Sequence, residues 1–187
     1  MQVWMVGVGL AFLMIVGSIL WIMPSKRDRR IAKLRQAAIL RGIKVKLMKY
    51  PMINLSGRVE EGVIDAAAYA FKGIDEEEIT AGWMLIKSYQ SSAEQESDSA
   101  APEGWAWYIN QQALSDDIMS HVESFLRKHS EQVQALSVMT GSITIGWNEQ
   151  GDISELDGFE LWVKELRQLL TVYFKRLKDE RVENIGE

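Results

Sequence analysis

The sequence predicts an α+β protein: an N-terminal transmembrane helix followed by a domain with a mostly antiparallel sheet of four to six strands and two major helices. Three observations lead to this prediction. Residues 1–23 carry no ionisable side chain, short apolar runs bounded by turn residues recur between residues 43 and 147, and residues 156–180 carry a wide apolar stripe at helical spacing.

Residues 1–23 have the length of a membrane span. About 20 apolar residues, each rising ~1.5 Å along a helix, cross a hydrocarbon layer ~30 Å thick. Trp4 and Trp21 lie near the two ends, where aromatic rings prefer the headgroup layer. A cleavable signal peptide is the alternative, but it would carry its positive charge before the apolar run. We therefore expect a transmembrane helix over 1–23.

Residues 24–42 predict a basic helix next to the membrane. Ser25 and Asp28 have the spacing of a capping box, and Gly42 supplies a stop. The basic residues expected to face anionic lipid headgroups are Lys26, Arg27, Arg29, Arg30, Lys33 and Arg35. Their position predicts a bacterial cytoplasmic (inner) membrane protein with its N-terminus outside and its C-terminal domain in the cytoplasm. Setting this topology and docking on lipid are alternative roles for the basic residues.

The order of these features resembles YajC, the accessory subunit of the bacterial Sec translocase. The resemblance rests on the apolar start, the exit Ile22-Met23-Pro24-Ser25-Lys26-Arg27, the basic helix, and the step Arg41-Gly42-Ile43-Lys44-Val45 into a strand. It covers residues 1–47. The chain then departs from the family, because it lacks the Gly-Asp and Gly-Gly turns that follow the helix in YajC and is much longer. The resemblance implies association with a membrane machine such as the translocase and transfers no functional residue.

Residues 43–187 are expected to form one α+β domain. Alternating apolar and basic residues over 43–49 predict a strand, turn residues over 52–65 predict a loop, and the aromatic residues of 66–72 favour another strand. Residues 66–72 could also form a helical turn.

Two aromatic segments, residues 82–89 and 104–109, predict a pair of strands that form a hairpin. The small, polar and acidic residues 90–103 between them predict a disordered loop. The large aromatic side chains on these strands are Trp83, Trp105, Trp107 and Tyr108. Burial in the core and exposure as a candidate partner surface are alternative interpretations of these side chains.

The rest of the chain alternates between helical and strand patterns. Ser115 precedes a helix that runs to about residue 129, and residues 134–147 predict a hairpin or a bulged strand around Gly141-Ser142. The last helix is expected over about 156–180, with its apolar stripe covering one face of the sheet.

Composition restricts the chemistry. The absence of cysteine excludes disulfides and thiol catalysis. Residues 1–50 carry ten Lys or Arg and one acid, whereas residues 51–187 carry eleven Lys or Arg and twenty-five acids. Because the second part is strongly acidic, we expect no binding to nucleic acid.

The candidate bases are His121 and His129, the two histidines of the chain. They lie eight residues apart on one predicted helix, which is too far for one metal ion. Residues 75–78 are four adjacent acids without the spacing of a cation loop. We therefore expect no catalytic residue, no cofactor and no metal site.

The sequence thus predicts a non-enzymatic single-pass membrane protein whose cytoplasmic domain binds a protein partner. The alternative is a membrane-tethered enzyme or small-ligand-binding protein whose site is assembled from dispersed residues. Such a site would be a pocket lined by convergent polar groups with shifted pKa values. A lipid-surface sensor is a third possibility, based on the basic residues alone.

Overall fold

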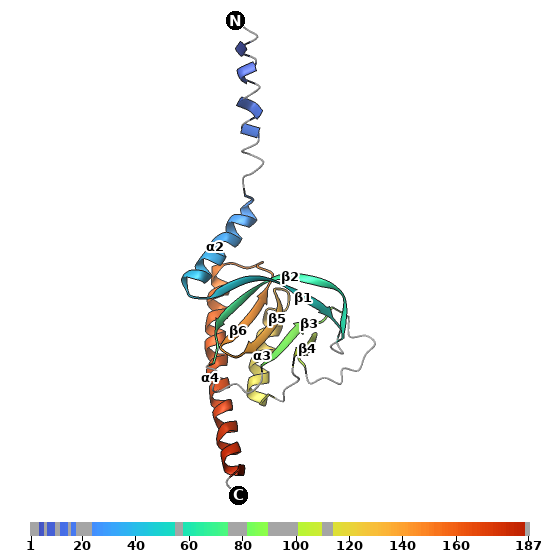
Figure 1. Ribbon diagram of the computed structural model, residues 1–187, viewed down its shortest axis with the longest axis vertical. Helices are drawn as coiled ribbons and strands as arrows, with labels where there is room; N and C mark the ends of the chain where they lie inside the picture. Colours follow the sequence, from blue (N-terminus) through green and yellow to red (C-terminus); the bar gives the residue numbers. More distant parts are fainter. Residues whose placement is uncertain are drawn as a thin grey trace. The chain divides into compact units, whose positions relative to one another are not determined.

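The structure is a computed structural model that describes residues 4–5, 7–9, 12–14, 16–17, 24–54, 58–74, 82–89, 101–109 and 114–185, with side chains to residue 179. The chain divides into two units, Met1–Lys33 and Leu34–Glu187. The second unit contains the sheet and the helices α3 and α4 (Figure 1).

Within residues 1–23, the described residues 4–5, 7–9, 12–14 and 16–17 are helical. A span requires about 20 continuous apolar residues in one helix. None of the helices in the described residues combines the length and the apolar character that crossing a bilayer requires. This finding contradicts the predicted transmembrane helix over 1–23. The same finding contradicts the predicted inner-membrane location, with its outside N-terminus and cytoplasmic domain.

Helix α2 (Lys26–Leu40) begins at the predicted capping box. The backbone N–H of Asp28 donates to Ser25 Oγ at 3.1 Å, and the backbone N–H of Ser25 donates to Asp28 Oδ2 at 3.1 Å. The Ser25 hydroxyl, which donates to Asp28 Oδ2 at 2.7 Å, and then the Ser25 N–H lower the pKa of the Asp28 carboxyl. Leu34 and Ala38 are buried in the core, so the narrow apolar stripe of α2 packs against its own domain.

The sheet contains six strands. Their bounds are β1 (Lys44–Ile53), β2 (Val59–Lys72), β3 (Trp83–Lys87), β4 (Trp105–Ile109), β5 (Val133–Met139) and β6 (Ser142–Trp147). Their order is β1-β2-β6-β5-β3-β4, and each neighbouring pair is antiparallel. The two helices of the second half are α3 (Asp116–Lys128) and α4 (Ile153–Ile185).

The predicted loop over 52–65 is wrong for most of its length. Strand β1 continues to Ile53, and β2 begins at Val59 and pairs with β1 from there. The sequence interpretation gave weight to the turn residues and missed the strand formers between them. Gly62, with φ of 129°, is accommodated within β2.

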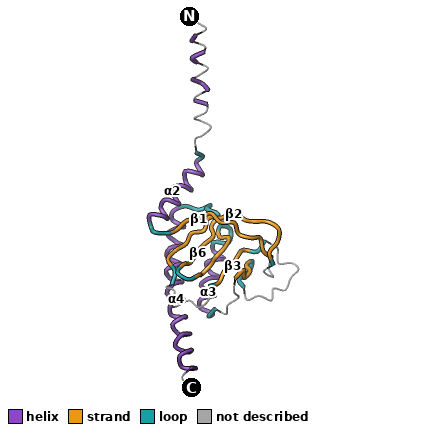
Figure 2. The backbone as a smooth tube through the Cα atoms, in the orientation of Figure 1, coloured by secondary structure: helices purple, strands orange, loops and turns teal. Residues whose placement is uncertain are grey.

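The β1–β2 hairpin curls over the rest of the sheet. Strand β2 pairs with β6 only from Ala67 to Lys72, so the distal half of the hairpin extends beyond β6. At its end, the carbonyl of Ile53 accepts a hydrogen bond from the N–H of Tyr89, 3.4 Å away and just after β3. The sheet is therefore a curled half-barrel (Figure 2).

Side chains of α2, α3 and α4 form the main core together with one face of the sheet. The sheet contributes Tyr69, Phe71, Trp83, Leu85, Leu136, Ile143, Ile145 and Trp147, and the long helix α4 contributes Phe159, Trp162, Leu166, Leu170 and Phe174. These residues alternate along each strand with those of the other face, as a pleated sheet requires. The prediction that the last helix covers one face of the sheet is confirmed.

The opposite face of the sheet carries a second, smaller cluster of buried residues. Its members are Tyr50, Ile53, Ala66, Ile86, Ala106 and Ala135. A Cβ at Gly146 would lie 3.0 Å from the Tyr50 ring, so the glycine lets this ring cross over β2 and fill the inside of the curl. Burial raises the pKa of Tyr50 to about 12.

The remaining strand and helix predictions are confirmed with small shifts. β3 and β4 form a hairpin, and β5 and β6 turn through Gly141 at φ of 73°. Helix α3 follows Ser115 as expected, and α4 begins at Ile153, three residues before its predicted start. Residues 90–100 of the predicted disordered loop over 90–103, and the acidic residues 75–78, lie outside the described residues.

Candidate functional site

The aromatic side chains singled out by the sequence lie on different faces. Trp83 is 0% exposed and Trp105 4% exposed, and both belong to the main core. Trp107 is half-buried and lies edge-on to Trp83, with ring centroids 5.9 Å apart. Tyr108 is 42% exposed on the opposite face of β4. Burial favours the core interpretation for the first two tryptophans, and the four side chains do not meet at one surface.

Five of the six basic residues expected to face lipid are exposed on α2; they are Lys26, Arg27, Arg29, Arg30 and Lys33. Arg35 instead forms a bidentate ion pair with Glu149. Its Nε donates to Oε1 at 2.7 Å and its Nη2 donates to Oε2 at 2.5 Å. Binding of anionic lipid by the exposed five stays a prediction.

Glu149 is the centre of a buried polar cluster. The carboxylate is 6% exposed, and its Oε1 also accepts a hydrogen bond from the hydroxyl of Tyr69 at 2.8 Å. The hydrogen bonds of Glu149 raise the pKa of Arg35, while burial followed by the same carboxylate raises the pKa of Tyr69. These contacts join α2 to β2 and to the segment after β6, so the cluster has a structural role.

A half-open groove of about 530 Å³ lies between α3 and α4. Its lining residues are His121, Ser124, Phe125, Lys128, His129, Ser154, Glu155, Gly158, Leu161, Trp162 and Glu165. Pockets of roughly 300–1,000 Å³ are typical of small-ligand sites. Both histidines of the chain line this groove, which makes it the strongest candidate site in the described part of the chain.

The floor of the groove is apolar and aromatic. The rings of Phe125 and Trp162 stack with centroids 3.9 Å apart, and Leu161 is 60% exposed at the side. The groove is open beside Gly158, where a Cβ on α4 would meet no atom within 4 Å. A glycine inside a helix costs about 1 kcal/mol relative to alanine, so helix propensity does not explain why Gly158 stands within α4.

His121 lies flat on the groove wall. Its ring stacks on Trp162 at a centroid distance of 5.5 Å and an interplanar angle of 5°. Its Nε2 lies 3.9 Å from the Glu165 carboxylate, which is beyond hydrogen-bond distance. Among the described residues, this buried nitrogen has no hydrogen-bond partner.

His129 ends α3 in an aromatic environment. Its ring centroid lies 4.9 Å from that of Phe125 and 5.0 Å from that of Phe159. Burial and the neighbouring charge of Lys128 lower the pKa of the imidazole, and Glu155 opposes this shift more weakly. His129 is therefore neutral at pH 7.

Acid should weaken the folded state through His129. The pKa of His129 in the folded state lies below its unfolded value of about 6.5, so the unfolded chain binds more protons than the folded chain as the pH falls. The stability that neutral His129 contributes is complete above pH 6.5 and is lost as the pH falls through the folded-state pKa. We expect the free energy of unfolding to fall from pH 7 to pH 5 by more in the wild type than in His129→Gln. Urea unfolding at the two pH values measures this difference, and equal losses in both proteins would contradict it.

The groove has the chemistry of a binding site. Glu155 accepts a hydrogen bond from Gln132 Nε2 through Oε1 at 3.0 Å, but its buried Oε2 has no partner among the described residues. The backbone N–H of Ser154 donates to Asp152 Oδ1 at 2.8 Å, so Asp152 caps α4. The described part of the chain holds no cluster of three or more His, Asp or Glu that would bind a metal ion. The groove thus combines an aromatic floor with the carboxylates of Glu155 and Glu165.

Sequence reasoning found the histidines but missed the groove. The signal that could have revealed it is Gly158, a glycine within a strong helical pattern. Glu149 was not identified either, because its φ of 58°, which is unusual for a side chain larger than Asn, has no signature in the sequence.

The fold and the groove define an α+β domain in which a curled antiparallel sheet supports two helices that enclose a ligand-sized groove. Comparison with protein-family models, with curated proteins and with solved structures found no match to this chain. The resemblance of residues 1–47 to YajC stays a prediction.

Proposed function

We propose that this protein is a non-enzymatic interaction domain whose α3–α4 groove binds an apolar or aromatic side chain of a partner protein together with an N–H donor. The observation that carries the proposal is that the stacked rings of Phe125 and Trp162 line one groove together with the carboxylates of Glu155 and Glu165. A carboxylate beside an aromatic floor can accept a hydrogen bond from a ligand whose apolar part covers the rings. The ring floor supplies the apolar contact that dominates most interfaces.

The charge of the groove favours a cationic or amide donor. Glu155 and Glu165 contribute two carboxylates, Lys128 contributes one ammonium, and His129 is neutral at pH 7 because its pKa is lowered. A carboxylate ligand would therefore meet repulsion, whereas an ammonium group beside an aromatic ring gains both an ion pair and a cation–π contact.

A second candidate function is the binding of a small molecule of the same chemistry. The observation that favours it is the volume of the groove, about 530 Å³, which is that of a typical small-ligand pocket. A partner side chain and a free small molecule would use the same floor and the same acceptor, so one set of variants tests both.

Filling the groove should abolish binding without disturbing the fold. Phenethylamine is a suitable probe because it joins a phenyl ring to an ammonium group, and phenylacetate reverses the charge. We expect phenethylamine to shift the NMR signals of the Trp162 indole N–H and of the α3 backbone, and phenylacetate to bind at least about tenfold more weakly. In Gly158→Phe the new ring occupies the groove, so these shifts should disappear.

Gly158→Ala is the matched control. A methyl group at this position meets no atom within 4 Å, so it should leave binding unchanged and stabilise α4 by about 1 kcal/mol. Equal binding of both probes, or binding that survives in Gly158→Phe, would overturn the proposal that this groove is the site.

A further inference from the structure

The outer edge of β1 is open over most of its length. Strand β1 stands at one end of the sheet order, and no described strand pairs with its outer side before Ile53, which meets Ser88. Pro51 lacks an N–H and so limits ladder formation at that end. The edge available for pairing is therefore Lys44–Tyr50. This segment is longer than an average strand of about 5–6 residues.

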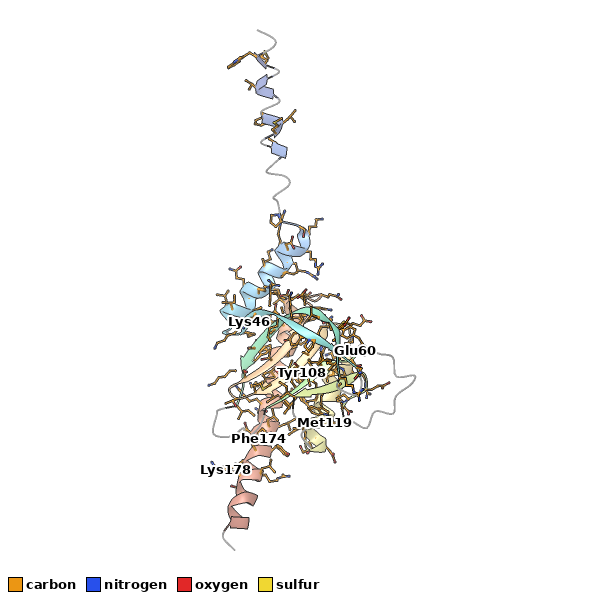
Figure 3. All side chains as sticks on the ribbon, turned by 45° about the vertical axis from the view of Figure 1, so that its right-hand side comes forward. Lys46, Glu60, Tyr108, Met119, Phe174 and Lys178 are labelled. Carbon is orange, nitrogen blue, oxygen red and sulfur yellow. The ribbon has the colours of Figure 1, made fainter. Side chains whose placement is uncertain are left out.

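This edge is basic in an otherwise acidic part of the chain. Lys44, Lys46 and Lys49 are all exposed, and the segment contains no acid. Lys46 lies at the surface of the sheet in Figure 3. Across the ladder, Lys44 and Lys46 stand opposite Ala70 and Ala68, so β2 supplies no acid to either. Lys49 alone faces a carboxylate of β2.

The edge also exposes apolar surface between the charges. Leu47 is 67% exposed and Met48 39% exposed. Side chains alternate between the two faces of a strand, so Lys44 and Lys46 lie on one face while Val45 and Leu47 lie on the other. Val45 packs on the main core, so an added strand would meet the ammonium groups of Lys44 and Lys46 on one face and the exposed Leu47 beside Lys49 on the other.

A second copy of this chain does not fit the edge. Pairing of two β1 edges would bring three lysines of one copy against three of the other, and like charges opposed across a ladder are destabilising. Edge lysines are a known protection against such pairing. The same charges attract a strand of opposite sign.

We propose that β1 accepts an acidic extended segment of another protein as a seventh strand, running antiparallel to Lys44–Tyr50. Directly opposed residues share a face, so the segment that fits has acidic residues at alternate positions and apolar residues between them. Backbone hydrogen bonds to the edge supply the affinity, and the lysines select the charge of the segment. This surface is separate from the α3–α4 groove and does not depend on the function proposed for it.

The experiment titrates the full-length protein with the blocked peptide Thr-Val-Glu-Val-Glu-Val-Thr at low salt. We expect binding that weakens with added salt, and amide hydrogen exchange in Lys44–Tyr50 that slows at least about tenfold. The control peptides are Thr-Val-Lys-Val-Lys-Val-Thr and the acidic peptide methylated on all its central backbone nitrogens. Both should bind at least about tenfold more weakly, because one has the wrong charge and the other cannot form the ladder.

Charge variants test the lysines directly. Lys44→Glu combined with Lys46→Glu should weaken binding of the acidic peptide about tenfold, while Lys175→Glu combined with Lys178→Glu, on exposed positions of α4, should leave it unchanged. Equal effects of the two double variants would overturn the proposal, as would equal binding of the methylated peptide. Slow exchange, in the free protein, of those N–H groups of Lys44–Tyr50 that point away from β2 would also overturn it. Another copy or a different part of the chain would then cover the outer edge of β1.

Discussion

Arg35→Met should lower the free energy of unfolding by about 3 kcal/mol, because it leaves the buried carboxylate of Glu149 without its cation. Methionine keeps the length and the apolar stem of the side chain, so the loss comes from the charge. Glu149 is 6% exposed and cannot recover its solvation in place. For a chain of this size, the loss corresponds to a fall of roughly 6–12 °C in Tm, measurable by circular dichroism.

The cost should be asymmetric across the pair. Glu149→Gln keeps an acceptor for Tyr69 and leaves Arg35, whose side chain is 33% exposed and can reach water. We expect this variant to lose only about 1 kcal/mol. If Glu149→Gln lowered the free energy of unfolding by more than Arg35→Met, the buried carboxylate would not be the cause of the loss.

Arg41→Met is the matched control at the end of the same helix. Arg41 pairs with Asp157 at 2.5 Å and with Glu160 at 3.4 Å, but both acids are more than half exposed. Exposed ion pairs contribute about 0–1 kcal/mol, so this change should be nearly neutral. A loss equal to that of Arg35→Met would mean that burial does not distinguish the two pairs.

Periodicity revealed the elements whose partners are near in sequence. The alternation in β1 and β3, the Gly141 turn and the stripe of α4 each place apolar residues at a spacing that one type of element explains. The distal half of β2 was missed, although its partner β1 is near in sequence, because the turn residues over 52–65 outweighed the strand formers between them. For residues 1–23, hydropathy predicted a span that no helix of the described residues provides.

The groove and the ion pair could not be predicted, because each joins residues far apart in the chain. Arg35 and Glu149 are 114 positions apart, and their meeting depends on where α2 ends and how the turn after β6 is shaped. Likewise, His121 and Glu155 come together only through the packing of α3 on α4. From residue type alone, Arg35 was expected on a basic helix, and His121 and His129 were expected to lie too far apart to share a metal ion.

Trp147→Ala should cost about 4 kcal/mol, because it opens a cavity at one of the two largest fully buried side chains. Trp147 is 0% exposed, and its ring lies 4.9 Å from Phe159 and 5.3 Å from Tyr69 by centroid distance. The loss should be measured by chemical unfolding at pH 7. Because Tyr69 holds Glu149, a cavity beside it should also loosen the ion pair.

Trp147→Phe separates ring packing from the polar atom of the indole. Among the described residues, Trp147 Nε1 is buried without a hydrogen-bond partner, so phenylalanine removes an unsatisfied N–H together with part of the ring. The gain of about 1–3 kcal/mol from losing that group should offset much of the packing loss, and we expect a net cost below about 2 kcal/mol.

Trp4→Ala, at a side chain 79% exposed, should change stability by less than about 0.5 kcal/mol. If Trp147→Ala and Trp4→Ala had the same small effect, Trp147 would not be the packing centre between β6 and α4.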